Sequence, residues 1–144
     1  MNEKSSKEID FIIDSRFENV CLIGMAIREL CSLVPLKSAE AFKIELGVVE
    51  AVNNTIEHSY INKSRSKILV RFSLTQEMLI VEIQDRGKTM DFRGPPSLNF
   101  DPEKRESLPE GGVGRFIIHQ IMDEVNYQTK DRKNILTLIK HIKS

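Results

Sequence analysis

One helical segment in the first half of the chain carries polar side chains that a helix does not need. The segment "ELGVVEAVNNTIEHSY", residues 45–60, has the apolar spacing of a helix. Glu50, Asn54 and Glu57 fall on one stripe of it, opposite the apolar face. The ordinary interpretation is a solvated surface, but such surfaces favour residues with a higher helix propensity than asparagine. A carboxylate one turn before an amide can instead polarise a hydroxyl group while the amide oxygen ligates a hard cation such as Mg²⁺.

A second polar position lies where a strand is expected to end. Asp85 closes the apolar, alternating segment "MLIVEIQD", and Gly87 follows two residues later. The ordinary interpretation is a tight turn, because aspartate and glycine are common there. The functional interpretation is a carboxylate that accepts a hydrogen bond from an exocyclic amine at the base of a pocket. The glycine would then let the backbone approach a ligand closely.

A third cluster consists of glycines that open a helix. Gly111, Gly112 and Gly114 lead directly into the apolar segment "RFIIHQI". Free backbone N–H groups and the positive end of a helix dipole attract phosphate at such a place. The cluster is not a Walker motif, because no Gly-Lys-Ser/Thr sequence follows. It is not a dinucleotide-binding fingerprint either, because it follows a long loop and not a strand.

The composition limits the partners that these clusters can serve. The chain has 144 residues with 40% hydrophobic and 29% charged residues, which predicts one soluble domain. Lys+Arg and Asp+Glu both number 21, so no overall field favours nucleic acid or a membrane surface. The two cysteines, Cys21 and Cys31, lie in one expected helix and cannot pair within it. We expect a reduced, cytoplasmic protein without a signal peptide or membrane span.

Changes of hydrophobic period along the chain predict the elements that must position the three clusters. Helical spacing alternates with period-two spacing, and a long segment rich in proline and glycine, residues 86–112, has no period. The expected elements are a strand (9–14), helices (18–34 and 38–60), a β-hairpin (67–85), a helix (112–125) and two closing strands (125–129 and 134–142). This order predicts an α/β two-layer sandwich, with a mixed, mostly antiparallel sheet and helices on one face.

Taken together, the three clusters resemble the N, G1 and G2 boxes of the GHKL superfamily, which includes gyrase B, heat-shock chaperone, histidine kinase and mismatch-repair ATPases. The segments "EAVNNTIEHSY", "DRGKTMDF" and "GGVGRFIIHQIMDEV" closely resemble the small stand-alone serine kinases that act as anti-sigma factors. The resemblance covers nearly the whole chain. It implies a single histidine-kinase-like ATPase domain over residues 1–144 with a Bergerat-type ATP-binding fold.

The resemblance also implies a role for each site residue. Glu50 would be the general base that takes the proton from a partner serine or threonine. Asn54 would hold the Mg²⁺ ion that bridges the phosphates of ATP. Asp85 would accept a hydrogen bond from the adenine amino group, with Gly87 allowing the base to lie close to the backbone.

Phosphate binding is implied for the glycine-rich segment. Gly111, Gly112 and Gly114 would wrap the phosphates, and residues 92–110 would form the ATP lid.

At three further positions the expectation comes from comparing this sequence with the pattern of the family that it resembles. Arg115 stands where many relatives have an apolar residue; its side chain can either reach the γ-phosphate or point to solvent, and we expect solvent. Asn134 is expected to replace the glycine-threonine pair that touches adenine through water in relatives. His58 is expected to line the end of its helix rather than to be phosphorylated.

In function, the resemblance implies an ATP-dependent serine/threonine protein kinase that is also an anti-sigma factor. Such a protein phosphorylates a STAS-domain anti-anti-sigma protein and binds a sigma factor, commonly as a homodimer, without contacting nucleic acid or a membrane. The alternative is a nucleotide-binding regulatory adaptor with little kinase activity that acts by sequestering its partner. The presence of Glu50 favours the kinase, because a pure binding protein does not need that carboxylate.

Overall fold

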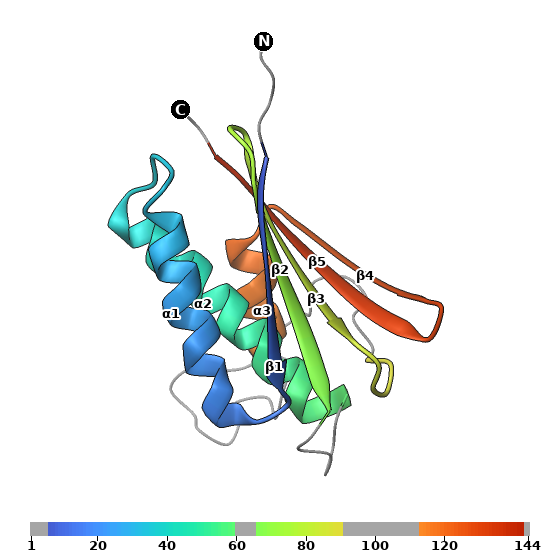
Figure 1. Cartoon of the computed structure of the whole chain (residues 1–144). Helices are drawn as coiled ribbons and strands as arrows, with labels where there is room; N and C mark the ends of the chain where they lie inside the picture. Colours follow the sequence, from blue (N-terminus) through green and yellow to red (C-terminus); the bar gives the residue numbers. More distant parts are fainter. Residues whose placement is uncertain (1–5, 60–65, 91–112, 143–144) are drawn as a thin grey trace, which may run out of the picture.

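The protein folds into two layers, a sheet and a set of helices that cover one of its faces (Figure 1). The structure, a computed structural model, describes residues 6–59, 66–90 and 113–142. Its strands are β1 (Lys7–Asp14), β2 (Lys67–Leu74), β3 (Met78–Asp85), β4 (Glu124–Lys130) and β5 (Lys133–His141). Its α-helices are α1 (Val20–Cys31), α2 (Ser38–Asn54) and α3 (Val113–Ile121). The predicted two-layer α/β sandwich and the predicted order of elements are confirmed.

The strands form one sheet in the order β1-β2-β3-β5-β4, and every neighbouring pair in it is antiparallel. β5 lies between β3 and β4, so the closing hairpin adds to the sheet through its second strand. This register places Asp85, at the end of β3, directly opposite Asn134 on β5. Two positions that are far apart in the sequence therefore share one end of the sheet.

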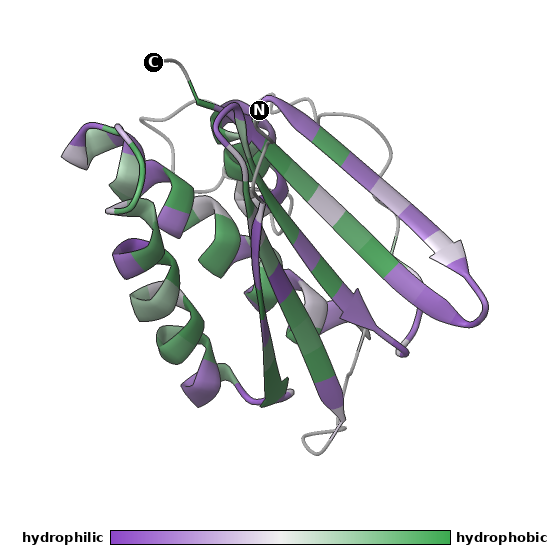
Figure 2. Cartoon of the chain, turned by 45° about the horizontal axis from the view of Figure 1, so that its top comes forward, coloured by the Kyte–Doolittle hydropathy of each residue, from purple (hydrophilic) through white to green (hydrophobic). Residues whose placement is uncertain are grey.

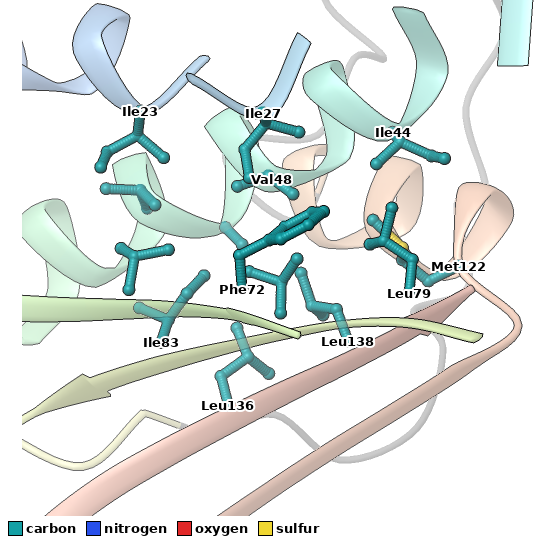
Figure 3. Close-up of a cluster of buried hydrophobic side chains, with 14 of the residues drawn as sticks. Ile23, Ile27, Ile44, Val48, Phe72, Leu79, Ile83, Met122, Leu136 and Leu138 are labelled. Atoms are coloured by element: carbon teal, nitrogen blue, oxygen red, sulfur yellow. The ribbon is translucent and has the colours of Figure 1, made fainter. Parts of the chain in front are cut away.

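Alternation along the strands makes one face of the sheet apolar. In β2 and β3 every second residue is buried, and β4 alone is mostly hydrophilic (Figure 2). Phe72 on β2 points from the sheet toward Ile27 of α1 and Val48 of α2, at the centre of the core (Figure 3). Burying a side chain of this size contributes about 1.5–3 kcal/mol. This packing fixes the helices on one side of the sheet.

Each of the first two helices has one apolar side toward the sheet. In α2 the buried residues are Ile44, Gly47, Val48, Ala51 and Val52. Phe42 is 61% exposed, because it lies nine residues, about two and a half helical turns, before the buried Ala51 and so on the opposite side of α2. On the outside, two guanidinium nitrogens of Arg28 on α1, Nε and Nη2, donate to the Glu45 carboxylate on α2, at 2.8 and 2.7 Å. None of the described helices is long and apolar enough to cross a membrane.

All three of the described α-helices end earlier than the sequence predicts, and α1 ends at Cys31 and not at 34. α2 ends at Asn54 and continues as a π-helical turn, Thr55–Ser59, whose backbone is wound more widely. α3 ends at Ile121 and not at 125, because the chain must turn into β4. There Asp123 donates its backbone N–H to the Ile139 carbonyl, and Lys140 Nζ donates to the Ile121 carbonyl at the end of α3.

The turn between β4 and β5 has a strained backbone. Asp131 and Arg132 have φ angles of 54° and 62°, in the left-handed region that disfavours residues with a Cβ atom. Two-residue hairpin turns require this conformation because its twist matches that of the strands, and glycine adopts it best. Asparagine and aspartate tolerate it, but arginine has no such advantage.

We therefore predict that Arg132→Gly stabilises the protein. Relief of left-handed strain at a non-glycine residue is partly offset by the greater freedom of glycine in the unfolded chain, leaving about 0.5–1 kcal/mol. Urea unfolding followed by circular dichroism measures the change. The matched control is Lys133→Gly, one residue later on β5, which should destabilise by a similar amount. Equal destabilisation by both variants would contradict the assignment of strain to Arg132.

Candidate functional site

The first two residues of the polar stripe on α2 face the beginning of α3. A Cβ atom placed on Gly114, the second residue of α3, would lie 2.7 Å from Oε2 of Glu50. The same atom would lie 3.5 Å from Oδ1 of Asn54. Both side chains are half-buried, so the stripe is not the solvated surface that its sequence permits. A side chain at position 114 would therefore displace the Glu50 carboxylate, so space and not backbone conformation favours glycine there.

The π-helical turn after α2 separates Glu57, the third residue of the polar stripe, from the start of α3. Thr55, the first residue of the turn, is fully buried, and its hydroxyl donates to the Ala51 carbonyl at 3.0 Å. Glu57 and His58 are exposed. A regular helix would have kept Glu57 in line with Asn54, but the wider turn changes the direction of the side chains beyond it. Only Glu50 and Asn54 therefore belong to the candidate site.

Asp85 lies at the end of β3, as predicted, and it lies on the buried side of the sheet. Its side chain is almost fully buried, and its Oδ1 atom accepts hydrogen bonds from two donors. One is the backbone N–H of Gly87 at 2.9 Å, which forms the expected turn. The other is Nδ2 of Asn134 on β5, also at 2.9 Å. A buried carboxylate held in this way is a fixed acceptor at the end of the sheet.

Asn134 is the centre of a hydrogen-bond network around this carboxylate. Its amide nitrogen also donates to the Gly87 carbonyl at 3.0 Å. Its amide oxygen accepts from the hydroxyls of Thr129 on β4, at 2.9 Å, and Thr89, at 3.1 Å. Asn134 was expected near the base through the resemblance, whereas Thr89 and Thr129 were not found from the sequence. Only the strand register and the path of the chain after β3 bring the two threonines together.

Tyr127 on β4 binds the segment that follows Thr89. Its hydroxyl oxygen accepts the backbone N–H of Met90 at 3.0 Å. Burial raises the pKa of Tyr127, the Met90 hydrogen bond opposes this, and the negative charge of Asp85 raises the pKa further. The phenol is therefore neutral and lies close enough to Asp85 to sense its charge. Together with Asn134, it ties the segment after β3 to the closing hairpin through hydrogen bonds.

We expected Arg115 to point to solvent, but its side chain is partly covered by the protein. It is half-buried one turn before His119 on α3, and Met122, which follows α3 on the same side, is buried. Burial lowers the pKa of His119, and the positive charge of Arg115 lowers it further. His119 is therefore neutral at physiological pH. The two side chains line the buried side of α3, next to the glycine that faces Glu50.

Several predicted features lie outside the described residues. Gly111, Gly112 and the expected lid, residues 92–110, are among them. Of the predicted site residues, the structure brings Glu50, Asn54 and Gly114 together, and it places Asp85 and Gly87 together at the end of β3.

The sequence matches one family model along most of its length. The model describes the histidine kinase-like ATPase domain, and residues 13–140 match it. The chain belongs to this family. Membership implies an ATP-binding site, and it confirms the predicted relation to the GHKL ATPases.

Curated relatives match nearly the whole chain. A protein of Staphylococcus aureus (strain bovine RF122 / ET3-1) named serine-protein kinase RsbW is 30% identical over 145 aligned positions, covering 96% of this chain and 90% of its own. Proteins with the same name from Bacillus velezensis and Bacillus subtilis (strain 168) are each 27% identical, covering 86% and 83% of this chain and 81% and 77% of their own. The predicted resemblance to stand-alone serine kinases is confirmed.

Solved structures share the fold. The RsbU and RsbW domains of Rv1364c from Mycobacterium tuberculosis match with a TM-score of 0.67 and 14% identity, over 94% of this chain and 32% of theirs. A histidine kinase domain from Erythrobacter litoralis matches with a TM-score of 0.53 and 20% identity, over 90% of this chain and 62% of its own. The arrangement of helices and sheet described above is therefore that of this family.

The chemistry of the described residues fits a nucleotide with its cation. Glu50 and Asn54 present oxygen atoms, the donors that Mg²⁺ prefers, beside a helix start that lacks a Cβ atom. No group of three or more His, Cys, Asp or Glu residues within the described ranges could hold a metal by itself. Mg²⁺ commonly uses one or two protein ligands and completes its shell with phosphate oxygens and water. Phosphate oxygens would therefore have to complete a shell based on Asn54.

We predict that Gly114→Ala weakens ATP binding without unfolding the protein. The added methyl group would displace the Glu50 carboxylate, which is the end of a flexible side chain, and would fill space beside Asn54. A steric clash of this kind with a bound phosphate costs about 1–3 kcal/mol, so affinity should fall roughly 5- to 150-fold. Calorimetric titration with Mg-ATP measures the affinity.

The control for this variant is Gly24→Ala on α1. Its added Cβ would lie 3.1 Å from Val49 Cγ2, which is also a tight contact, although a less severe one, and lies away from the site. Its affinity for Mg-ATP should equal that of the wild type. Unchanged affinity in Gly114→Ala would mean that the space beside Glu50 is not used by the nucleotide.

A second prediction concerns the carboxylate at the end of β3. Asp85→Asn should weaken ATP binding by about 1.5–3 kcal/mol, because a charged acceptor of the adenine amino group becomes neutral. The same titration measures the loss. Asp123→Asn, at the end of the sheet beside His141, makes the same chemical change elsewhere and should leave the affinity unaltered. Wild-type affinity in Asp85→Asn would remove Asp85 from the nucleotide site.

Proposed function

We propose that this chain is an ATP-dependent serine/threonine protein kinase and an anti-sigma factor. It transfers the γ-phosphoryl group of ATP to a hydroxyl of a STAS-domain antagonist protein, and it also binds a sigma factor. Family membership supports the ATP site, and the curated relatives named serine-protein kinase support the reaction. The observation that carries the proposal is the convergence of Glu50, Asn54 and Gly114 from two helices.

Glu50 is proposed as the general base. Its carboxylate is half-buried next to the first turn of α3, where backbone N–H groups and the helix dipole attract phosphate. A hydroxyl group that enters beside Glu50 gives its proton to the carboxylate as its oxygen bonds to the γ-phosphorus. The bond from that phosphorus to the bridging oxygen breaks, and ADP leaves. General-base assistance of this kind contributes about 10²–10⁴-fold to a rate.

Asn54 and Asp85 position the two ends of the nucleotide. Asn54, one turn after Glu50, is proposed to hold Mg²⁺, which when bound neutralises charge on the phosphates. At the end of β3, Asp85 is proposed to accept the adenine amino group, with Gly87 close to the ring. Phosphoryl transfer needs mainly orientation and charge neutralisation, so no covalent intermediate with the protein is required.

The state in which the protein acts is part of the proposal. We propose a homodimer in the cytoplasm, in line with the neutral balance of charges and with exposed apolar residues on and near α1. Phe17, Leu22, Met25 and Leu33 are each more than half exposed. These exposed apolar side chains offer surface that a second protein chain can cover.

The decisive test removes the proposed base. Glu50→Ala should keep ATP binding but lower phosphoryl transfer to a STAS-domain partner by about 10²–10⁴-fold. Radiolabelled ATP and the partner recovered from native cells by co-purification provide the assay. Glu57→Ala is the matched control, because Glu57 belongs to the same stripe in the sequence but is exposed beyond the π turn.

Two outcomes would count against the proposal in different ways. Unchanged transfer by Glu50→Ala would refute the general base. Binding of ATP and of a partner by the wild type, without any phosphoryl transfer, would replace the kinase by the regulatory adaptor.

A further inference from the structure

The network around Asn134 raises a question that the proposed reaction leaves open. Asn134 is nearly fully buried, and it lies at the end of the sheet beside the proposed adenine acceptor. A buried amide in this position can either contact the base itself or serve the residues that do. The described hydrogen bonds distinguish the two roles.

The amide group of Asn134 uses its full hydrogen-bonding capacity on the protein. An asparagine side chain has two N–H donors and an oxygen with two lone pairs. The donors go to Asp85 Oδ1 and the Gly87 carbonyl, and the oxygen accepts from Thr89 and Thr129. No donor or lone pair is left for a base. The side chain of Asn134 therefore has no group free to contact adenine. This differs from the expectation that Asn134 replaces the glycine-threonine pair of relatives.

The direction of the amide is determined by its neighbours. On one side stand a carboxylate oxygen and a carbonyl oxygen, which can only accept. On the other side stand two hydroxyls, both of which can donate. Reversing the amide would set its oxygen against the Asp85 carboxylate, so the group is held in one orientation.

Asn134 thereby forms hydrogen bonds to both parts of the proposed base site, Asp85 and Gly87. It holds the oxygen of Asp85 and the carbonyl of Gly87, while Thr129 ties it to β4. If Asn134 only closed the hairpin, its partners would lie on β4 and β5. Instead, three of its four bonds go to β3 or to the segment after it.

We propose that Asn134 is a positioning residue for nucleobase selection: it fixes the Asp85 carboxylate and the Gly87 backbone so that the site accepts a base with an exocyclic amine and rejects one with a carbonyl there. This inference rests on the proposed function, because it assumes that the base lies at Asp85. A carboxylate can accept from the amine of adenine but repels the corresponding oxygen of guanine. Rejection requires that the carboxylate cannot turn away, and the two donors on Oδ1 prevent this.

The test compares ATP with GTP. Wild type and variants are titrated with Mg-ATP and Mg-GTP, at a temperature where circular dichroism finds each variant folded. Asn134→Ala should bind ATP about 10- to 100-fold more weakly, the usual effect of losing a hydrogen bond to a buried charge. Its preference for ATP over GTP should fall about tenfold, because the freed carboxylate can turn away from the guanine oxygen.

A second variant keeps the proposal testable if Asn134→Ala does not fold. Thr89→Val with Thr129→Val leaves Asn134 in place but removes both hydroxyls that orient its oxygen. Both threonines are exposed, so the fold should tolerate the change. The double variant should lose part of the preference for ATP. Thr137→Ala, on the other face of β5, is the control and should keep both affinities.

The outcomes separate this inference from the proposed function. Failure of the wild type to bind ATP ends the proposed function and the inference with it. If the wild type binds ATP but Asn134→Ala matches it, only the inference is overturned. A loss of ATP and GTP affinity by equal factors also overturns it, because a purely structural role weakens both nucleotides alike.

Discussion

The structure depends on burying one face of an antiparallel sheet under three helices. Strands β2, β3 and β5 present every second side chain to that face, and nearly all of these side chains are apolar. A shift of one residue in any strand would turn its apolar set to solvent. The register is therefore fixed by hydrophobic burial, and with it the position of every polar group at the ends of the strands. Asp85 and Asn134 occupy buried positions in this alternation, where an apolar residue would otherwise stand.

The two halves of the candidate site are attached to this core in different ways. Glu50 and Asn54 project from α2, whose opposite side is packed on the sheet, toward a helix start where the absence of a Cβ atom leaves room. Asp85 is held from the sheet itself, by donors on β5 and on the turn that follows β3. Rigid elements position both halves, which favours a reaction that needs orientation more than covalent chemistry.

Much of the fold and of the site was predictable from local patterns. The change from helical to period-two spacing at residue 67 located the hairpin, and the glycines before α3 located a helix start. The ends of the helices were less predictable. α2 gives way to a π turn after Asn54, and α3 stops at Ile121, where the chain turns into β4; helix propensity is too weak a guide to specify either end. Phe42 is apolar but exposed, because it lies on the side of α2 opposite to the buried Ala51.

The sequence by itself determined the residue types that can do chemistry, the period of each element and the membership of the family, since these depend on side chains close together along the chain. It identified Glu50, Asn54, Asp85 and Gly114 as separate polar or small positions. Only the tertiary structure decided which of them meet. The packing of α2 against α3 brings Gly114 to Glu50, and the pairing of β3 with β5 and β4 brings Asp85, Asn134 and Thr129 into one network. Contacts across so many residues arise from the burial of the whole sheet, and no local pattern encodes them.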